Sequence, residues 1–164
     1  MERKELEKMF RIYYSEALLY SCALTHQSQD AEDIVQHAFL KALETAEGTI
    51  QEFKPWLFRV CRNEWLQMVR KRKQEDVDAE KALEKAVDTA PLPEAELIRE
   101  EEYRALYREL MNLSPEKREV MELFYFSECS IREIATIVGR TESNVKTMLS
   151  RARAELRERL EERL

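Results

Sequence analysis

Residues 130–153 read SIREIATIVGRTESNVKTMLSRAR and carry two short amphipathic patterns on either side of a single glycine. Ser130 and Glu133 have the spacing of a capping box at the start of a helix. The apolar residues that follow recur at helical spacing until Gly139, which tolerates the positive φ common where a helix ends. Thr141 can then cap a second helix. The stretch therefore predicts a helix-turn-helix.

The second helix of this motif separates apolar from polar side chains. Its inward side is expected to carry Val145, Met148, Leu149 and Ala152, which follow i, i+3, i+4, i+7 spacing. The outward side then presents short hydrogen-bonding groups and cations, which suit base edges and phosphates in the major groove. An ordinary helical hairpin with a polar outer side is the alternative. The candidate DNA-binding residues are Thr141, Ser143, Asn144, Lys146, Thr147, Ser150 and Arg151.

The composition favours an all-α fold. The 164 residues include only 2 glycines and 4 prolines, too few for the turns of a β-sandwich or barrel, or for a glycine-rich phosphate loop. The longest stretch without Asp, Glu, Lys or Arg is Ala17–Gln29, which is too short to span a bilayer. The opening MERKELEK lacks the apolar segment of a signal peptide. Because the three cysteines form no disulfide pattern either, we expect a cytoplasmic protein.

The net charge of −6 conceals a strong segregation of charge along the chain. Residues 53–73 hold seven basic and one acidic side chain, whereas residues 74–102 hold three basic and eleven acidic ones. The basic block indicates a local polyanion site, with two solvated helix faces as the alternative. Gln74–Pro93 has no aromatic residue and ends in two prolines, so we expect a flexible acidic linker there. The chain should therefore comprise two small helical domains, residues 1–73 and 94–164.

Apolar periodicity predicts helices in both domains. In the first, we expect helices over Glu2–Thr25, Asp30–Glu44 and Lys54–Lys73, with Asp30 as the cap of the second. In the second, we expect Glu94–Met111, Ser114–Phe126 with proline at its first position, and the two helices of the helix-turn-helix.

The helix expected over Lys54–Lys73 interleaves aromatic and basic side chains. Aromatic faces can stack on unpaired bases while the cations follow the phosphate backbone. For each tryptophan taken singly, a role as a core anchor is the favoured alternative. The candidate nucleic-acid-binding residues on this helix are Trp56, Arg59, Arg62, Asn63, Arg70, Lys71 and Arg72.

Three motifs in this order resemble the extracytoplasmic-function group of RNA polymerase sigma factors, which have only the second and fourth conserved regions. They are DAEDIVQ at residues 30–36 with Phe39, the basic aromatic helix, and LSPEKREV at residues 113–120 followed by the helix-turn-helix. The resemblance implies that the first motif docks on the clamp-helix coiled coil of core polymerase. It also implies that the basic helix reads the −10 element and the helix-turn-helix the −35 element. The core-binding candidates are Asp30, Glu32, Asp33, Gln36 and Phe39.

The resemblance further implies a promoter-specificity subunit that is not an enzyme and needs no cofactor. An anti-sigma factor is an implied partner and could hold the chain at the membrane. The expected linker is long enough for this role, since about 20 residues reach at most roughly 70 Å. The two promoter elements, separated by some 16 base pairs, lie about 55 Å apart.

Two other classes of protein compete with this interpretation. A helix-turn-helix activator would use the same C-terminal half without needing residues 30–39. An enzyme is poorly supported, since the sequence has two histidines and no nucleophile–base or paired-cysteine metal pattern. Cys22 and His26 could face His37 as a metal site, although an ordinary helix-face pair is the favoured interpretation.

Overall fold

The computed structural model describes residues 2–45, 52–75 and 93–162, so most of the expected linker lies outside the described residues. Within these ranges the chain is all-helical, as expected. The N-terminal group of helices comprises α1 (Arg3–Thr25), α2 (Ser28–Glu44) and α3 (Phe53–Glu75). The C-terminal group comprises the 3₁₀-helix η1 (Pro93–Leu97), α5 (Glu101–Leu110), α6 (Pro115–Tyr125), α7 (Ile131–Val138) and α8 (Glu142–Glu162).

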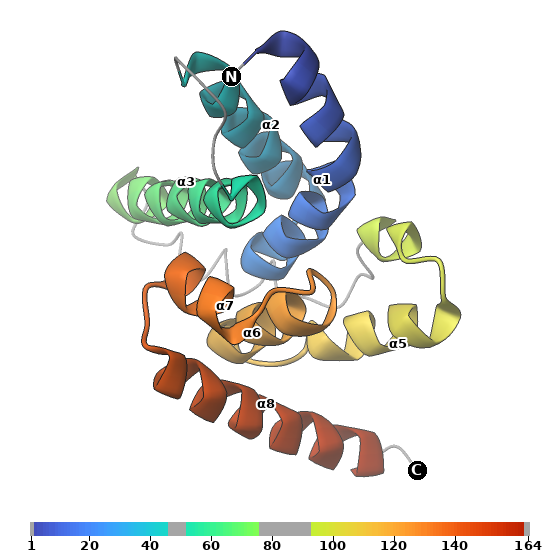
Figure 1. The fold of residues 1–164 in the computed structure, drawn as a ribbon. Coiled ribbons are helices and arrows are strands. Elements are labelled where there is room, and N and C mark those ends of the chain that lie inside the picture. The colour runs from blue at the N-terminus through green and yellow to red at the C-terminus, as the bar shows by residue number, and fades with distance from the viewer. Residues whose placement is uncertain (1, 46–51, 76–92, 163–164) are drawn as a thin grey trace.

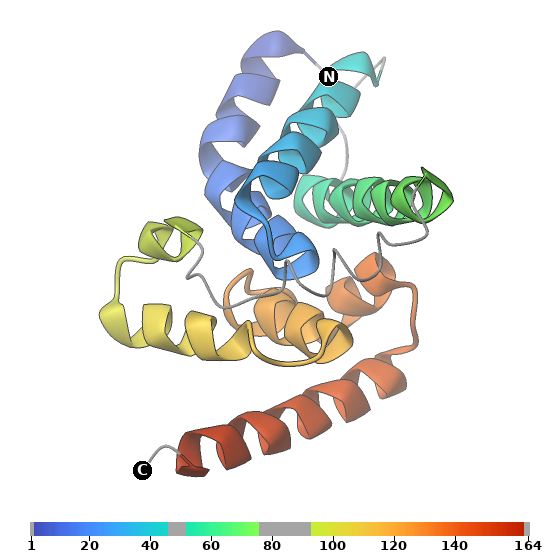
Figure 2. The same cartoon turned by 180° about the vertical axis from the view of Figure 1, so that it is seen from behind.

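The two groups are stacked on each other in Figures 1 and 2. The helices α1, α2 and α3 lie together on one side, and α6 and α7 lie directly against them. The contacts that join the groups run from α1 to α6 and η1, and from α3 to α7. Helix α8 runs along the far edge of the C-terminal group, where α6 and α7 separate it from α1–α3. The arrangement leaves one long side of α8 open.

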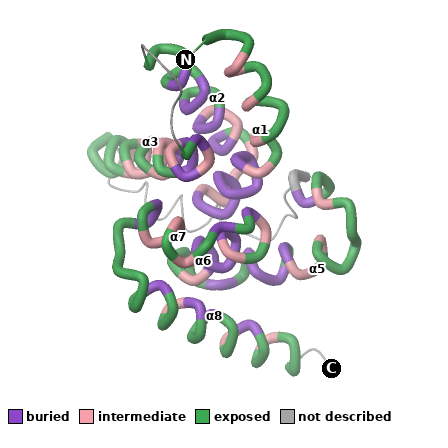
Figure 3. Tube along the Cα trace, viewed as in Figure 1, coloured by how far each residue is buried: buried purple, intermediate pink, exposed green. Residues whose placement is uncertain are grey.

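One apolar core extends through both groups, and its buried segments concentrate where α1, α3 and α6 meet (Figure 3). Its fully buried side chains include Tyr20 and Phe58 from the N-terminal group and Leu123, Ile134 and Leu149 from the C-terminal group. The rings of Tyr20 and Phe58 stack with centroids 5.0 Å apart. Because burial of apolar surface stabilises by about 25 cal/mol per Å², the contact between the groups contributes to the stability of the fold.

The helix-turn-helix forms as its local sequence predicts. The Ser130 hydroxyl accepts a hydrogen bond from the Glu133 amide at 3.1 Å, and the Glu133 carboxylate accepts one from the Ser130 amide at 2.9 Å. Gly139 ends α7 with φ of +70°, in the left-handed region. The hydroxyl of Thr141 accepts a hydrogen bond from the Asn144 amide at 3.1 Å, which caps α8. Both the capping box and the cap of the second helix are confirmed.

The start of α2 differs from the prediction. The helix begins at Ser28 and its N-cap is Gln27, so Asp30 lies within the first turn instead of capping it. The physical reason is a competing partner, because the Asp30 carboxylate faces Arg72 of α3.

The prediction of one continuous helix over Glu94–Met111 is also wrong, because the chain leaves the helical conformation between η1 and α5. The Glu96 carboxylate accepts hydrogen bonds from Arg104 and Arg108, each at 2.9 Å, across the interruption. Ala95 is buried in a small apolar cluster that also contains Leu19 of α1. These tertiary contacts fold η1 back onto α1, and one straight helix could not make them.

Candidate nucleic-acid interface

The outer side of α8 and its preceding turn form an open row of polar and cationic side chains. Among the described residues, neither Lys146 nor Arg151 has an ion-pair partner within the chain. The structure exposes all seven residues predicted for this surface, namely Thr141, Ser143, Asn144, Lys146, Thr147, Ser150 and Arg151. This surface can meet a DNA groove without breaking a charged contact inside the protein.

The opposite side of α8 holds the helix in place. Val145, Leu149, Ala152 and Leu156 are buried, and Lys117 of α6 pairs with Glu155 at 2.7 Å. The Lys117 ammonium lowers the pKa of the Glu155 carboxyl. Farther along, the Arg153 guanidinium donates to the Tyr125 hydroxyl at 2.7 Å. The outward row is therefore positioned by a helix anchored along its other side.

The candidate residues of α3 fall into three environments. Arg59, Asn63, Arg70 and Lys71 are exposed. Trp56 is half-buried, with its ring 5.9 Å from that of Phe53. Both tryptophans of α3 pack against the apolar core, as the core-anchor interpretation expects. The remaining two candidates, Arg62 and Arg72, are half-buried and are each held by a carboxylate from another helix.

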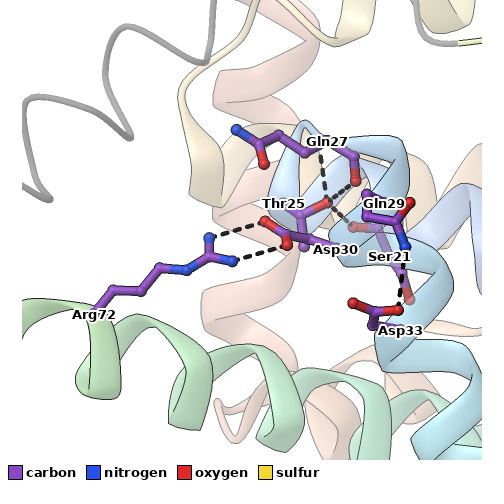
Figure 4. Close-up of polar contacts among 7 residues, drawn as sticks. All are labelled: Ser21, Thr25, Gln27, Gln29, Asp30, Asp33 and Arg72. Atoms are coloured by element: carbon purple, nitrogen blue, oxygen red, sulfur yellow. Dashed lines mark hydrogen bonds and ion pairs between the residues drawn. The ribbon is translucent and has the colours of Figure 1, made fainter. Parts of the chain in front are cut away.

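Arg72 makes a two-pronged contact with Asp30 of α2 (Figure 4). Its two terminal nitrogens donate to the two carboxylate oxygens, both at 2.8 Å. Such paired, charge-assisted hydrogen bonds are stronger than neutral ones, and they raise the pKa of the Arg72 guanidinium. In the same view, Asp33 lies one turn along α2, where it accepts a hydrogen bond from Gln29 at 3.4 Å. Asp30, a predicted core-binding residue, is therefore paired with Arg72, a predicted DNA-binding residue.

Arg62 meets a carboxylate of the C-terminal group. Its Nε donates to Glu119 Oε2 at 3.0 Å, and the Tyr20 hydroxyl donates to the same oxygen at 2.7 Å. Glu119 belongs to α6, so this contact connects three helices across the boundary between the two groups. The carboxylate and the Tyr20 hydroxyl are buried.

Only some of the core-binding candidates on α2 are accessible to a partner. Gln36 is exposed, and Glu32 and Asp33 are half-buried, so these three can reach a partner. Asp30 and Phe39 are buried at 8% and 6% exposure. The Phe39 ring lies 5.0 Å from that of Phe10, so it supports the surface from beneath.

Three apolar side chains near this surface escaped the sequence interpretation. Phe10, Leu40 and Leu43 are 43%, 52% and 48% exposed, respectively. Phe10 and Leu43 line a shallow groove between α1 and α2, with Phe39 at its base. The sequence did contain a signal for this surface, because residues 33, 36, 40 and 43 share one side of α2 and two of them are leucines. A helix with one apolar stripe in the core and a second one in solvent indicates a docking surface.

The residues considered for a metal site lie in different environments. His37 lies 3.8 Å from Glu64 of α3, whereas Cys22 is buried in the core. Within residues 2–45, 52–75 and 93–162, no group of three His, Cys, Asp or Glu residues could hold a metal ion. Over the same residues, no helix is long and apolar enough to cross a membrane.

Comparison with known proteins places both halves in one family. Residues 9–75 match Sigma-70 region 2, and residues 103–156 match Sigma-70 region 4. A helix-turn-helix activator would account for the second match alone, so that alternative is not favoured.

The chain is similar to the RNA polymerase sigma factor YlaC of Bacillus subtilis, with 31% identity over 96% of this chain and 93% of the relative. It is 30% identical to the ECF RNA polymerase sigma factor SigW of the same organism, over 80% of this chain and 75% of the relative. A probable sigma factor, RfaY of Xanthomonas campestris, is 33% identical over 86% of this chain, which spans only 36% of that longer relative.

Among solved structures, the chain is similar to the sigma factor RpoE of Bartonella quintana, determined in complex with the anti-sigma factor NepR. The TM-score is 0.72 with 26% identity, over 96% of this chain and 98% of that one. Sigma factors are DNA-binding initiation factors and, as a class, not enzymes. The paired regions and the full-length relatives show that this chain belongs to the extracytoplasmic-function group of RNA polymerase sigma factors.

Proposed function

We propose that this sigma factor reads the −35 element as duplex DNA with the outer side of α8. The observation that carries the proposal is the row of seven exposed polar and cationic residues, whose two cations have no ion-pair partner in the described chain. Short side chains near the start of α8 suit base edges, while Lys146 and Arg151 are long enough to reach phosphates. Among these residues, Ser143, Asn144 and Thr147 carry the base readout.

We assign capture of the unpaired −10 bases to α3. Arg59, Asn63, Arg70 and Lys71 are accessible for this role, and the partly exposed ring of Trp56 offers a stacking face. Arg62 and Arg72 are held by Glu119 and Asp30, and release of these carboxylates would free their full set of donors for phosphates. The −10 surface is therefore completed when those carboxylates are exchanged for phosphates.

We assign the docking of core polymerase to the exposed side of α2. Asp33 and Gln36 supply polar contacts, and Leu40 and Leu43 add apolar area beside them. An apolar centre with a polar rim is the usual anatomy of a protein interface. Within this surface Phe39 acts from beneath, and Asp30 acts through its contact with Arg72.

We further propose the division into residues 1–73, a linker of residues 74–93, and residues 94–164. An anti-sigma factor is the proposed regulator, supported by the anti-sigma factor bound to the similar RpoE. The chain would then work in the cytoplasm, where the polymerase is, and be kept from it until that partner releases it.

Transcription by core polymerase on a fragmented genome tests the proposed function. We expect initiation only when the purified chain is added, from start sites that share a −35 and a −10 sequence. Binding of the chain to such fragments without any initiation would contradict the proposal and favour an activator instead.

The docking surface is tested by Asp33→Arg, which places a cation on the exposed side of α2. We expect weaker binding to core polymerase with unchanged helix content. The control is Glu102→Arg on α5, which makes the same change of charge at an exposed position outside the surface. Equal affinities of both variants for core polymerase would remove this assignment.

A further inference from the structure

Arg153 lies on α8 close to the candidate DNA-binding residues, but its contacts are made inside the protein. Its Nε donates to the Tyr125 hydroxyl at 2.7 Å. Its guanidinium carbon lies 5.2 Å from the centre of the Phe124 ring and 5.6 Å from the centre of the Tyr125 ring. A guanidinium suits both kinds of partner, because it is a planar cation with several donors. Arg153 therefore ties α8 to the last turn of α6.

A second tie joins α8 to the opposite end of α6. The Lys117 ammonium lies 2.7 Å from Glu155 Oε2, and Lys117 belongs to the first turn of α6. Arg159 donates to the other oxygen of the same carboxylate at 3.4 Å. Helix α8 is thus held at both ends of α6 by polar contacts that reach out from residues 153 and 155.

The two ties lie on opposite flanks of the buried side of α8. Successive residues of an α-helix are rotated by about 100°, so residues 153 and 155 point about 200° apart. The buried side chains lie between these two directions, namely Val145, Leu149, Ala152 and Leu156. Rotation of α8 about its own axis, in either direction, would therefore stretch one of the two ties.

A small rotation of α8 is enough to disturb base readout. Apolar contact is non-directional, so the buried side alone leaves some freedom of rotation. A rotation of about 20° moves a group about 5 Å from the helix axis by about 2 Å. The distances of good hydrogen bonds span only about 0.5 Å. Contacts with base edges therefore depend on this rotation more than contacts between long cations and phosphates do.

Both ties are accessible to solvent. Tyr125 is 39% exposed, and the side chains of Lys117 and Glu155 are 34% and 27% exposed. Exposed ion pairs and cation–π contacts contribute little to stability. Hydrogen bonds are nevertheless directional, so these contacts bear on the orientation of α8 more than on the folding of the chain.

We infer that Arg153 is a positioning residue for recognition of the −35 element, which together with Glu155 fixes the rotation of α8 against α6. This inference rests on the proposed function, since it takes α8 as the helix that reads the −35 element. Arg153 acts through Tyr125 and Phe124 and makes no contact with DNA itself. The two ties determine how strictly the outer side of α8 selects bases.

Initiation by core polymerase carrying the full chain, on a library of −35 sequences in one reaction, tests this role. Preference is a ratio between promoters in the same reaction, so a change in the amount of active polymerase cancels. Arg153→Ala should lower the preference for the best −35 sequence over its single-base variants by about tenfold, which is within the discrimination of one good base contact. The matched control is Arg157→Ala, which removes an exposed arginine one turn farther along α8 and should keep the wild-type preference. The salt slopes of the two variants should be equal, because neither loses a phosphate contact.

Tyr125→Leu separates positioning from contact with DNA, because it removes the partner of Arg153 without changing α8 or its charge. It should reduce −35 preference as Arg153→Ala does, and the double variant should be no worse than either single one. Tyr125→Phe loses only the hydroxyl and should retain part of the preference. Glu155→Ala breaks the tie on the other flank and should also lower −35 preference. All these variants should leave −10 preference unchanged.

Two outcomes would overturn the inference. If Arg153→Ala weakens all promoters alike and reduces the salt slope by about one, while Tyr125→Leu has no effect, Arg153 contacts a phosphate. If the variants lower only the unfolding midpoint and the total initiation, with −35 preference unaltered, the ties are structural alone. Asn144→Ala distinguishes a failure of the proposed function. Should it leave −35 preference unchanged, α8 is not the reading helix; should it alone shift that preference, only the role of Arg153 is refuted.

Discussion

The two candidate DNA-reading helices differ in what their cations already bind. On α3, Arg62 and Arg72 are held by carboxylates of α6 and α2. On α8, Lys146 and Arg151 are exposed and, within the described chain, have no ion-pair partner. The cause is position in the fold, because α3 packs against α1, α2 and α7 whereas α8 lies at the edge and leaves one side open.

This difference shows that surfaces with similar residue types, here those of α3 and α8, can differ in how many of their cations are already paired within the protein. The proposed −35 surface of α8 is preformed, so its binding energy would be available for contacts with DNA. On the proposed −10 surface of α3, Arg62 and Arg72 would first exchange internal partners for external ones, which would reduce net affinity but couple DNA binding to the arrangement of the chain. Changes at buried contacts between helices should therefore alter stability, whereas changes on the open surface of α8 should alter DNA recognition.

The largest effect is expected from Glu122→Gln, at the buried contact between α6 and the N-terminal group. Glu122 is fully buried, and burial raises the pKa of its carboxyl from 4.5 to about 8. Glu16 and Glu119 also raise this pKa, whereas Ser127 and Lys54 lower it. The folded protein therefore retains a proton that the unfolded chain loses, so the free energy of unfolding should fall as the pH rises from 4.5 to about 8.

Urea unfolding at pH 5 and pH 8 measures this effect. The glutamine variant keeps the shape without the titration, so it should be roughly 2–4 kcal/mol more stable than the wild type at pH 8 and nearly equal to it at pH 5. Glu116→Gln, at an exposed position on the same helix, is the control and should follow the wild type. Parallel pH profiles for wild type and Glu122→Gln would show that the buried carboxyl does not matter.

On the open side, Asn144→Ala should alter discrimination among −35 variants by about 1–3 kcal/mol. Asn144 lies exposed in the first turn of α8, near the end expected to enter the groove. Lys146→Ala is the contrasting variant, since loss of a phosphate contact should weaken all promoters alike and reduce the salt slope by about one. Initiation from libraries of −35 and −10 sequences measures both. If Asn144→Ala lowers every −35 variant equally, or shifts −10 preference, the assigned orientation of α8 is wrong.

The smallest effect is expected on the free energy of unfolding when one arginine is removed from α3 or from α8. Arg72→Ala leaves the buried Asp30 carboxylate without its main partner and should lower the free energy of unfolding by about 1–2 kcal/mol, a range discounted for partial exposure of the pair. Arg151→Ala removes a free surface cation and should change stability by less than about 0.5 kcal/mol. Urea unfolding midpoints of the two variants give the comparison. Equal shifts would mean that the contact between α2 and α3 contributes nothing.

Local sequence alone determined much of this protein. The all-helical class, the capping box at Ser130, the end of α7 at Gly139 and the exposed outer side of α8 were all predictable. Each depends on residues within one or two helical turns, where side-chain spacing sets which groups meet. The motifs also identified the family, although the roles of single side chains are still predictions.

Tertiary structure alone decided which partners the charged residues take. Arg72 meets Asp30 across 42 residues and Arg62 meets Glu119 across 57, and no local pattern indicates either pair. The exposure of Leu40 and the break between η1 and α5 have the same origin. In each case the helix has more than one apolar or charged side, and the side that becomes buried depends on which other helices pack against it. That choice depends on how the two helical groups pack, which is a property of the whole fold.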